Sequence, residues 1–159
     1  MNAIRVLTIT IALGLAACQT SPSKPGSDTG QTQCRRIDER EVATLFDRWN
    51  DSLQTGDSHK VADNYAPRSI LLPTVSNKPR VTREEKIDYF DHFLVNQPSG
   101  KIDFRFVVIG CNSALDAGLY TFTFKKTGDT VAARYSYTYA WDGKQWLITS
   151  HHSSAMPEK

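Results

Sequence analysis

The sequence has little net charge and no concentration of charge of either sign. Its 19 lysine and arginine side chains are nearly balanced by 17 aspartates and glutamates, which leaves a formal net charge of +2. The only adjacent basic pairs are Arg35–Arg36 and Lys125–Lys126. A nucleic-acid-binding surface needs a basic patch or stripe, which two separate pairs do not supply. Nucleic acid is therefore not an expected partner.

The sequence also lacks an apolar run long enough to cross a bilayer as a helix, which takes about 20 residues. The run "VLTITIALGLAA" (Val6–Ala17) follows Arg5 and has the length of the apolar region of a signal peptide. It leads into "LAAC" (Leu15–Cys18), which resembles the bacterial lipoprotein box, whose cysteine is acylated. The alternative is an ordinary signal peptide that Cys18 merely follows. We expect residues 1–17 to be a lipoprotein signal peptide and Cys18 to carry the lipid.

Residues 18–33 have almost no apolar side chains. After Cys18, every residue but Lys24 and Asp28 is Gln, Thr, Ser, Pro or Gly, a composition that buries too little apolar surface to offset the entropy of ordering. A flexible coil of this length reaches about 20 Å. We therefore expect residues 18–33 to be the lipidated cysteine and a flexible linker. By resemblance to bacterial lipoproteins, Gln19 rather than Asp after the cysteine implies sorting to the outer membrane if the cell has two membranes, with the domain facing the periplasm of the cell envelope.

Cysteine is scarce, with three in the chain. If Cys18 carries lipid, Cys34 and Cys111 remain, and they lie in an oxidising compartment. A disulfide between them would close a long loop and stabilise the domain by about 4 kcal/mol in the chain-entropy description. Two free buried thiols are the alternative. We expect the disulfide.

Residues 34–159 are enough for one domain with a modest core. Apolar residues at steps of three and four over Ile37–Asp57 predict an amphipathic helix, and a short second helix follows it. Ser69–Val75 is a short extended run. A further helix begins at Thr82, because Glu85 three residues later completes a capping box.

Four strands follow in succession. Turn signals separate them, with Gly or Asp in two of the three turns. Helices followed by an antiparallel meander predict an α+β fold in which the helices pack on one face of a curved sheet. The predicted strands are "KIDFRFVVIGCN", "LDAGLYTFTFKK", "TVAARYSYTYAW" and "QWLITSHHSSAM".

This order of elements resembles the nuclear transport factor two-like (SnoaL-like) cone fold. More narrowly, it resembles the association, or hub, domain of calcium/calmodulin-dependent protein kinase II. The resemblance implies a cone-shaped, curved antiparallel sheet over residues 34–159 and a homo-oligomer, either a dimer or a ring. The sequence has no kinase catalytic motif, so no kinase activity is implied. The stretches that carry the resemblance are "FDRWNDSLQTGD", "NYAPRSILLPTVSNKPR", "IDYFDHFL", "VVIGCNSALDAG" and "DGKQWLITSHHSSAMP".

Two histidines and two serines, His151 to Ser154, adjoin near the end of the chain. Neighbouring residues of a strand point to opposite faces, so His151 and His152 cannot easily hold one metal ion, and no ligand spacing recurs elsewhere. The serines lack a GxSxG elbow. We therefore expect no metal, no cofactor and no catalytic residue among them.

Strict alternation places His152 on the same face as Trp146 and Ile148. The resemblance aligns His152 with a strand histidine of the kinase hub, which implies that it lines the cavity of the cone. A structural role, bonded to the backbone or to a tyrosine, is the alternative.

Two arginines, Arg105 and Arg134, lie within predicted strands, where burial is costly without a partner. The hub family uses arginines in its cavity to hold small carboxylates. The resemblance therefore implies Arg105 and Arg134, with Arg80 third, as ligands of a small anion. Ion pairs on an outer face or an interface are the alternative. Tyr65 and Tyr89 could line the same pocket with their hydroxyls, although packing in the core explains them as well.

Aromatic side chains gather on one face of the predicted sheet. If the helices cover the opposite face, a second subunit must cover this one, and we expect a homo-oligomer on that ground. If the helices cover the aromatic face, these residues form the core and the argument for a partner fails. The residues are Tyr120, Phe122, Phe124, Tyr135, Tyr137, Tyr139 and Trp141.

The sequence thus predicts a lipid-anchored, oligomeric binding or assembly domain, with a cavity for a small anionic ligand. A binding role is favoured over an enzymatic one. The second hypothesis is a SnoaL-like isomerase, cyclase or hydrolase that acts on a small hydrophobic molecule in the cavity. The fold alone does not decide between them, because it hosts both classes.

Overall fold

The computed structural model describes residues 34–158. The predicted signal peptide, the lipidation site Cys18 and the linker lie outside these residues. None of the helices described is long and apolar enough to cross a membrane. The elements are α1 (Glu39–Gln54), α2 (Ser58–Ala62), β1 (Tyr65–Leu72), α3 (Arg83–Phe93), the 3-10 helix η1 (Leu94–Asn96), β2 (Pro98–Ile109), β3 (Ser113–Phe124), β4 (Thr130–Trp141) and β5 (Trp146–Ala155).

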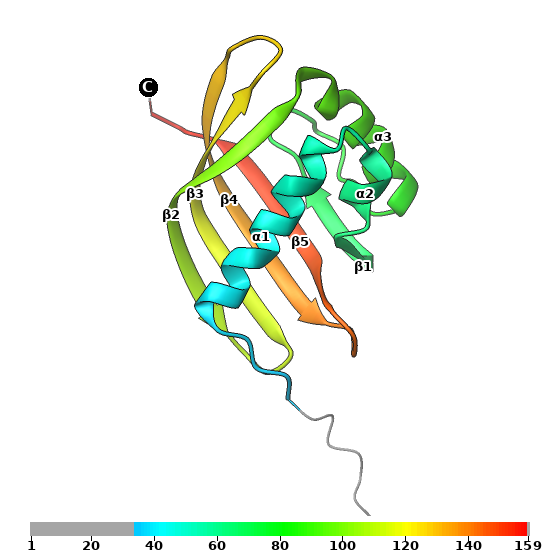
Figure 1. The fold of residues 1–159 in the computed structure, drawn as a ribbon, viewed down its shortest axis with the longest axis vertical. Coiled ribbons are helices and arrows are strands. Elements are labelled where there is room, and N and C mark those ends of the chain that lie inside the picture. Colours follow the sequence, from blue (N-terminus) through cyan, green and yellow to red (C-terminus); the bar gives the residue numbers. More distant parts are fainter. Residues whose placement is uncertain (1–33, 159) are drawn as a thin grey trace, which may run out of the picture. The chain divides into compact units, whose positions relative to one another are not determined.

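The five strands form one curved sheet in the order β1-β5-β4-β3-β2. Strands β2 to β5 are an antiparallel meander, as predicted. The sheet curves around α1, with α2 and α3 beside β1 (Figure 1). The predicted α+β fold class is confirmed. One feature differs from the prediction: β1 pairs with β5 in parallel, so the sheet is mixed.

Local sequence signals determine where the helices begin. Asp38 accepts a hydrogen bond from the Glu41 amide (2.8 Å), and the Glu41 carboxylate accepts one from the Asp38 amide (3.1 Å). Thr82 and Glu85 make the same reciprocal pair at the start of α3, as predicted. Each box satisfies two backbone donors that the first turn of a helix leaves free. The buried side of α1 consists of Val42, Leu45, Phe46, Trp49 and Leu53.

The aromatic face of the sheet is the core. Tyr137 and Tyr139 are completely buried, and Tyr120 and Tyr135 are nearly so. The Tyr137 ring packs 5.7 Å from that of Trp49 on α1. The helices therefore cover the aromatic face, and the prediction that a second subunit covers it is wrong.

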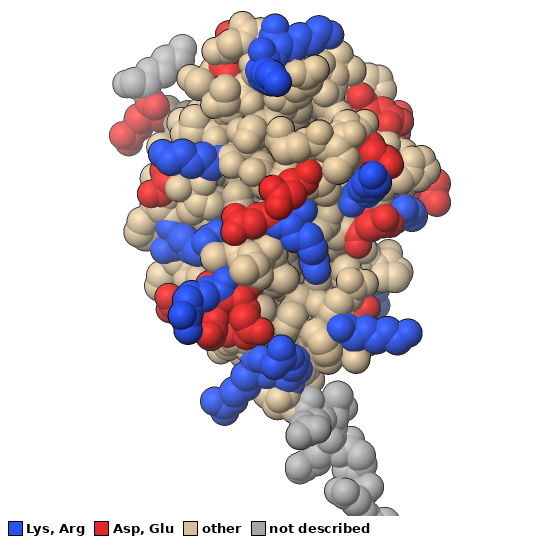
Figure 2. Space-filling model, in the orientation of Figure 1, with Lys and Arg blue, Asp and Glu red and all other residues tan. Residues whose placement is uncertain are grey.

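The opposite face of the sheet carries an apolar stripe on β2. Phe104 and Phe106 are each 58% exposed and Val108 is 49% exposed. These three residues alternate with the inward-facing Arg105 and Val107, which pack toward the core. We call Phe104, Phe106 and Val108 the outer stripe. On the face that carries α1, acidic and basic side chains are interspersed, in keeping with the small net charge (Figure 2).

The predicted disulfide is present. Cys34 is bonded to Cys111, with their Cα atoms 5.2 Å apart. The bond attaches the segment before α1 to the turn between β2 and β3. The Arg35 amide donates to Oδ1 of Asn112 (2.7 Å) beside it.

Candidate functional site

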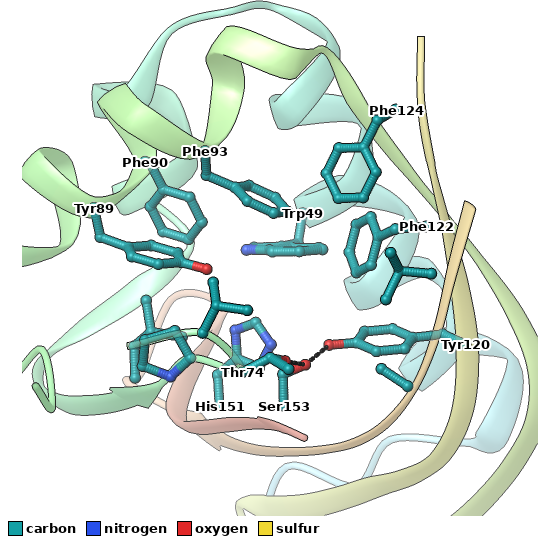
Figure 3. A pocket seen from close by; sticks show the side chains of 15 residues that line it. Trp49, Thr74, Tyr89, Phe90, Phe93, Tyr120, Phe122, Phe124, His151 and Ser153 are labelled. Carbon is teal, nitrogen blue, oxygen red and sulfur yellow. Dashed lines mark hydrogen bonds between the residues drawn. The ribbon is translucent and has the colours of Figure 1, made fainter. Parts of the chain in front are cut away.

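A cavity of about 120 Å³ lies between α3 and the inner face of the sheet. Trp49 of α1 and aromatic residues of α3 and β3 form most of its wall (Figure 3). Few polar groups reach it, and no residue of its lining carries a formal charge at neutral pH. The polar members of the lining are Thr74, Tyr89, Tyr120, His151 and Ser153.

His151, and not His152, is the histidine of this cavity. His151 is buried, whereas His152 is exposed on the outer face of β5. Tyr139 pairs with Ile148 and Thr138 pairs with Ser150, which leaves Thr149 as an extra residue on β5. Such a bulge reverses the alternation of the residues beyond it. The predicted place of His152 in the cavity wall is therefore wrong.

A chain of hydrogen bonds holds the His151 ring. The indole N–H of Trp49 donates to the Tyr65 hydroxyl (3.2 Å), and this hydroxyl lies 2.7 Å from Nδ1 of His151. We assign the hydroxyl hydrogen of Tyr65 to Nδ1, because Nδ1 is the only acceptor within hydrogen-bond distance of this hydroxyl among the described residues. The imidazole proton then resides on Nε2, which is buried and has no partner among the described residues.

The charge of His151 follows from its burial. Burial lowers the pKa of His151 to about 3, and nearby His152 lowers it further. The ring is neutral at physiological pH, because removal from water disfavours the imidazolium. The ring of His151, which lines the cavity, therefore carries an uncharged N–H donor on Nε2.

Three hydroxyl groups meet on the other side of the cavity. The Tyr120 hydroxyl donates to Oγ of Ser153 (2.5 Å), and Ser153 Oγ lies 2.5 Å from Oγ1 of Thr74 (Figure 3). Three hydroxyls carry three hydrogens, and these two bonds use two of them. The remaining hydrogen, on Thr74 or Ser153, is free to bond a ligand. We call Thr74, Tyr120 and Ser153 the hydroxyl cluster.

Long-range structure brings the hydroxyl cluster together. Thr74 lies in the loop after β1, which a pair of backbone hydrogen bonds between Leu71 and Arg80 closes (both 2.9 Å). The cluster joins residues 33 and 79 positions apart in sequence. Sequence reasoning singled out Ser153 only for its neighbouring histidines and missed Thr74, for which no local signal exists.

A second, more polar hollow adjoins the cavity. It has a volume of about 310 Å³ and shares Val75, Tyr89, Phe93 and Phe124 with the cavity wall. We call it the vestibule. Two of the predicted ligand-binding residues, Arg80 and Tyr89, line it, with the Arg80 guanidinium 5.8 Å from the Tyr89 ring centre.

The remaining predicted site residues lie elsewhere. Arg105 contacts Asp116 through Nε (3.2 Å) beneath α1, and Tyr135 donates to the same carboxylate (2.8 Å). Burial raises the pKa of Asp116, and these two partners oppose that rise. Arg134 is exposed on the outer face, where it donates to Ser154 (3.2 Å). Arg105 and Arg134 therefore do not line the cavity, which differs from the prediction.

Tyr65 takes part indirectly, through its bond to His151, and does not line the cavity itself. Among residues 34–158, no group of three or more His, Cys, Asp or Glu side chains is arranged to hold a metal ion.

Solved structures share this fold. A protein from Xanthomonas campestris, described as a candidate calcium/calmodulin dependent protein kinase II association domain, is 52% identical, with 77% of this chain and 91% of that chain covered and a TM-score of 0.74. An iota-carbonic anhydrase from a cyanobacterium, complexed with bicarbonate, is 20% identical, with 79% and 96% covered and a TM-score of 0.70. A nuclear transport factor two-like protein with a cystatin-like fold from Novosphingobium aromaticivorans is 11% identical, with 77% and 84% covered and a TM-score of 0.64.

No protein with a curated description matches the sequence. The sequence profile of the calcium/calmodulin dependent protein kinase II association domain matches residues 38–157, nearly the whole of the described domain. The fold, with its curved sheet wrapped around α1, agrees with that match. The chain belongs to the calcium/calmodulin dependent protein kinase II association domain family.

Proposed function

We propose that this association domain binds a small, oxygen-rich ligand, such as bicarbonate or a small carboxylate, in its aromatic cavity. The observation that carries the proposal is the buried Nε2 of His151, which has no partner among the described residues and belongs to a side chain that lines the cavity. Buried polar groups are nearly always hydrogen-bonded, so an orphaned donor in a cavity indicates a missing partner.

The hydroxyl cluster supplies a second donor across the same space. Two donors that converge on an apolar cavity favour a ligand with at least two acceptor oxygens. Neither donor carries a charge, so the site accepts such a ligand through hydrogen bonds alone.

Binding of bicarbonate to the full chain, followed by the width of its ¹³C resonance, tests the proposal. Ser153→Ala removes one hydroxyl of the cluster, and we expect it to weaken binding about tenfold. Ser154→Ala is the matched control, because Ser154 bonds Arg134 outside the cavity. Equal affinity of the two variants would contradict the proposed site.

We propose further that the domain forms a homo-oligomer through the outer stripe. Membership of an association domain family supports this, and so does the exposure of two phenylalanines and a valine side by side on β2. Sedimentation of the detergent-solubilised full chain tests it: Phe106→Asp should dissociate the assembly. Val95→Asp on η1, a similarly exposed position, should not. A wild-type monomer would end this part of the proposal.

The cellular setting is also a proposal. The lipoprotein box that ends at Cys18 and the polar linker support a domain tethered to the periplasmic side of the outer membrane. Mass spectrometry of the mature chain should find residues 1–17 removed and acyl groups on Cys18. Cys18→Ala should release the domain from the membrane fraction.

A catalytic use of the same cavity is the second candidate, and hydration of carbon dioxide is the reaction that it fits. The observation that favours it is the bicarbonate complex of a relative with the same fold. Carbon dioxide is small and apolar, as this lining requires. Water adds to its carbon, a C–O bond forms, one C=O bond becomes C–O⁻, and a proton leaves to solvent.

The two donors would stabilise the charge that develops on oxygen during this addition. Stopped-flow measurement of proton release from carbon dioxide tests it. The wild type should exceed the uncatalysed rate, Ser153→Ala should lose about 100-fold, and Ser154→Ala should match the wild type. A wild-type rate equal to the uncatalysed rate would contradict the catalytic proposal, and only the binding proposal would remain.

A further inference from the structure

A lysine side chain is buried beside the loop that carries Thr74. Lys86 belongs to α3 and is 1% exposed. No carboxylate of residues 34–158 lies within ion-pair distance of its ammonium. A buried cation without a carboxylate is costly, and an apolar side chain of the same length would fill the space without that cost. Packing alone therefore does not account for a lysine at this position.

Backbone carbonyl groups surround this ammonium. Nζ donates to the carbonyl oxygens of Ser69 (3.1 Å), Val81 (3.1 Å) and Thr82 (3.3 Å). An ammonium has three N–H donors, so these three bonds use all of them. The centre of the Tyr65 ring lies 5.7 Å from Nζ, within the range of a cation–π contact. The surroundings of Lys86 thus fit a charged side chain that is held by carbonyl oxygens and an aromatic ring.

The three carbonyl groups lie on both sides of one loop. Ser69 belongs to β1 and precedes residues 73–79, which we call the β1 loop. The other two carbonyl groups lie beyond the β1 loop, at the start of α3. One ammonium therefore joins the strand that enters the loop to the segment that leaves it. The backbone pair between Leu71 and Arg80 closes the same loop.

The contacts of Lys86 lead to both donors of the cavity. The β1 loop places Thr74 in the hydroxyl cluster. The hydroxyl of Tyr65, whose ring lies near the ammonium, contacts Nδ1 of His151. Lys86 itself does not line the cavity, so it acts on a ligand only through these groups.

We propose that Lys86 is a positioning residue of the cavity. Its ammonium holds the β1 loop in the place where Thr74 reaches Ser153, and its contact with the Tyr65 ring supports the bond from Tyr65 to His151. The inference rests on the proposed function and adds to it a residue that lies outside the cavity wall. Without the ammonium, the two sides of the β1 loop lose their shared donor, and the hydroxyl cluster loses the support of one member.

Replacing Lys86 by Met tests the inference, because Met has a similar length and no N–H donor. Bicarbonate binding to the full chain in detergent micelles is followed by the width of its ¹³C resonance, under conditions in which every variant is folded. We expect Lys86→Met to weaken binding about tenfold, which corresponds to one hydrogen bond to the ligand. Lys101→Met, at an exposed site, is the control for lost charge and should bind as wild type.

A second control separates positioning from stability. Leu53 is buried on α1 and does not line the cavity, so Leu53→Ala destabilises the fold without touching the β1 loop. It should bind bicarbonate as tightly as the wild type. Weakening as large as that of Lys86→Met would overturn the inference, because that result reports a general loss of stability.

Hydrogen exchange of the Leu71 and Arg80 amides follows the β1 loop directly, since each amide bonds the carbonyl of the other residue. We expect Lys86→Met to speed their exchange relative to the amides of β3 and β4. Leu53→Ala should not raise this ratio, because loss of global stability speeds exchange of the most protected amides. An unchanged ratio in Lys86→Met would contradict the role of Lys86 in holding the loop.

Ser153→Ala separates the inference from the proposed function. If Ser153→Ala weakens bicarbonate binding and Lys86→Met does not, the cavity site stands and the inference fails. If Ser153→Ala binds as tightly as the wild type, the cavity proposal fails. The exchange ratio then decides alone whether Lys86 holds the β1 loop.

Discussion

The Tyr65 hydroxyl lies 2.7 Å from Nδ1 of His151, in a contact that joins β1 to β5 across 86 residues of sequence. Trp49 of α1 donates to the same hydroxyl. One phenol oxygen therefore connects a helix and two strands, and it determines which nitrogen of His151 carries the proton. This contact therefore keeps a neutral N–H donor on the His151 ring, which lines the cavity.

Replacing Tyr65 by Phe removes the hydroxyl without changing the ring. Both Trp49 Nε1 and His151 Nδ1 then lose a buried partner, and we expect a loss of about 2 kcal/mol in the free energy of unfolding. The ¹⁵N shifts of His151 should change from the pure Nε2–H tautomer to a mixture. Tyr89→Phe is the control and should leave both quantities near wild type. A Tyr65→Phe protein with an unchanged tautomer would contradict the assignment.

The burial of His151 makes stability depend on pH. The pKa is about 3 in the folded state and near 6.5 when unfolded, so at a pH between these values the unfolded state binds more protons. The stabilisation is complete above pH 6.5 and is lost as pH falls toward 3. Between pH 7 and pH 5 we expect a loss of about 2 kcal/mol from this group.

Urea unfolding at a series of pH values measures this dependence. His151→Gln should remove the contribution of this group to the pH dependence. The free energy of unfolding should then change less between pH 4 and pH 6.5 than it does in wild type. His152→Gln, at an exposed site, should leave the curve as in wild type. Parallel curves for wild type and His151→Gln would show that His151 is not buried as a neutral ring.

The disulfide should contribute strongly to stability. Cys34→Ser with Cys111→Ser frees the start of the domain from the turn after β2, and we expect a loss of about 4 kcal/mol. Reduction of the wild type should reproduce the loss, and reduction of the double variant should have no effect. A stability that does not respond to reductant would mean that the bond does not form in the native protein.

Replacing Asp116 tests how much the Arg105–Asp116 ion pair contributes to the stability of the fold. Its Oδ1 accepts from Arg105 and Tyr135, so Asp116→Ala leaves a partly buried cation without its carboxylate partner and should cost about 3 kcal/mol. Asp103→Ala, which removes an exposed carboxylate that bonds Thr121 and Lys101, should cost far less, because water screens an exposed ion pair. Equal losses would show that the Arg105–Asp116 pair contributes no more than a surface contact.

Local patterns account for what the sequence predicted. The helices follow from periodic apolar residues and from the Thr82–Glu85 box, and the strands from alternation between turns. The pairing of Cys34 with Cys111 was predictable because few cysteines remained. Each of these signals lies within a short window or depends on a count.

The site depends on features with no local signature. The bulge at Thr149 reverses the facing of His151 and His152, and its cause is the pairing of β5 with β4. Strict alternation along β5 therefore predicted His152 for the cavity wall, where the structure has His151. Thr74 and Tyr120 reach Ser153 only because the β1 loop and β3 converge on β5. Their residue types gave no reason to group them.

A crystal structure of the full chain grown with bicarbonate tests the central claim most directly. We expect the anion in the aromatic cavity, with one oxygen within hydrogen-bond distance of Nε2 of His151 and another within that distance of Thr74 or Ser153. Bicarbonate bound elsewhere, or a cavity closed by a hydrogen bond between Nε2 and another protein atom, would contradict the proposed site.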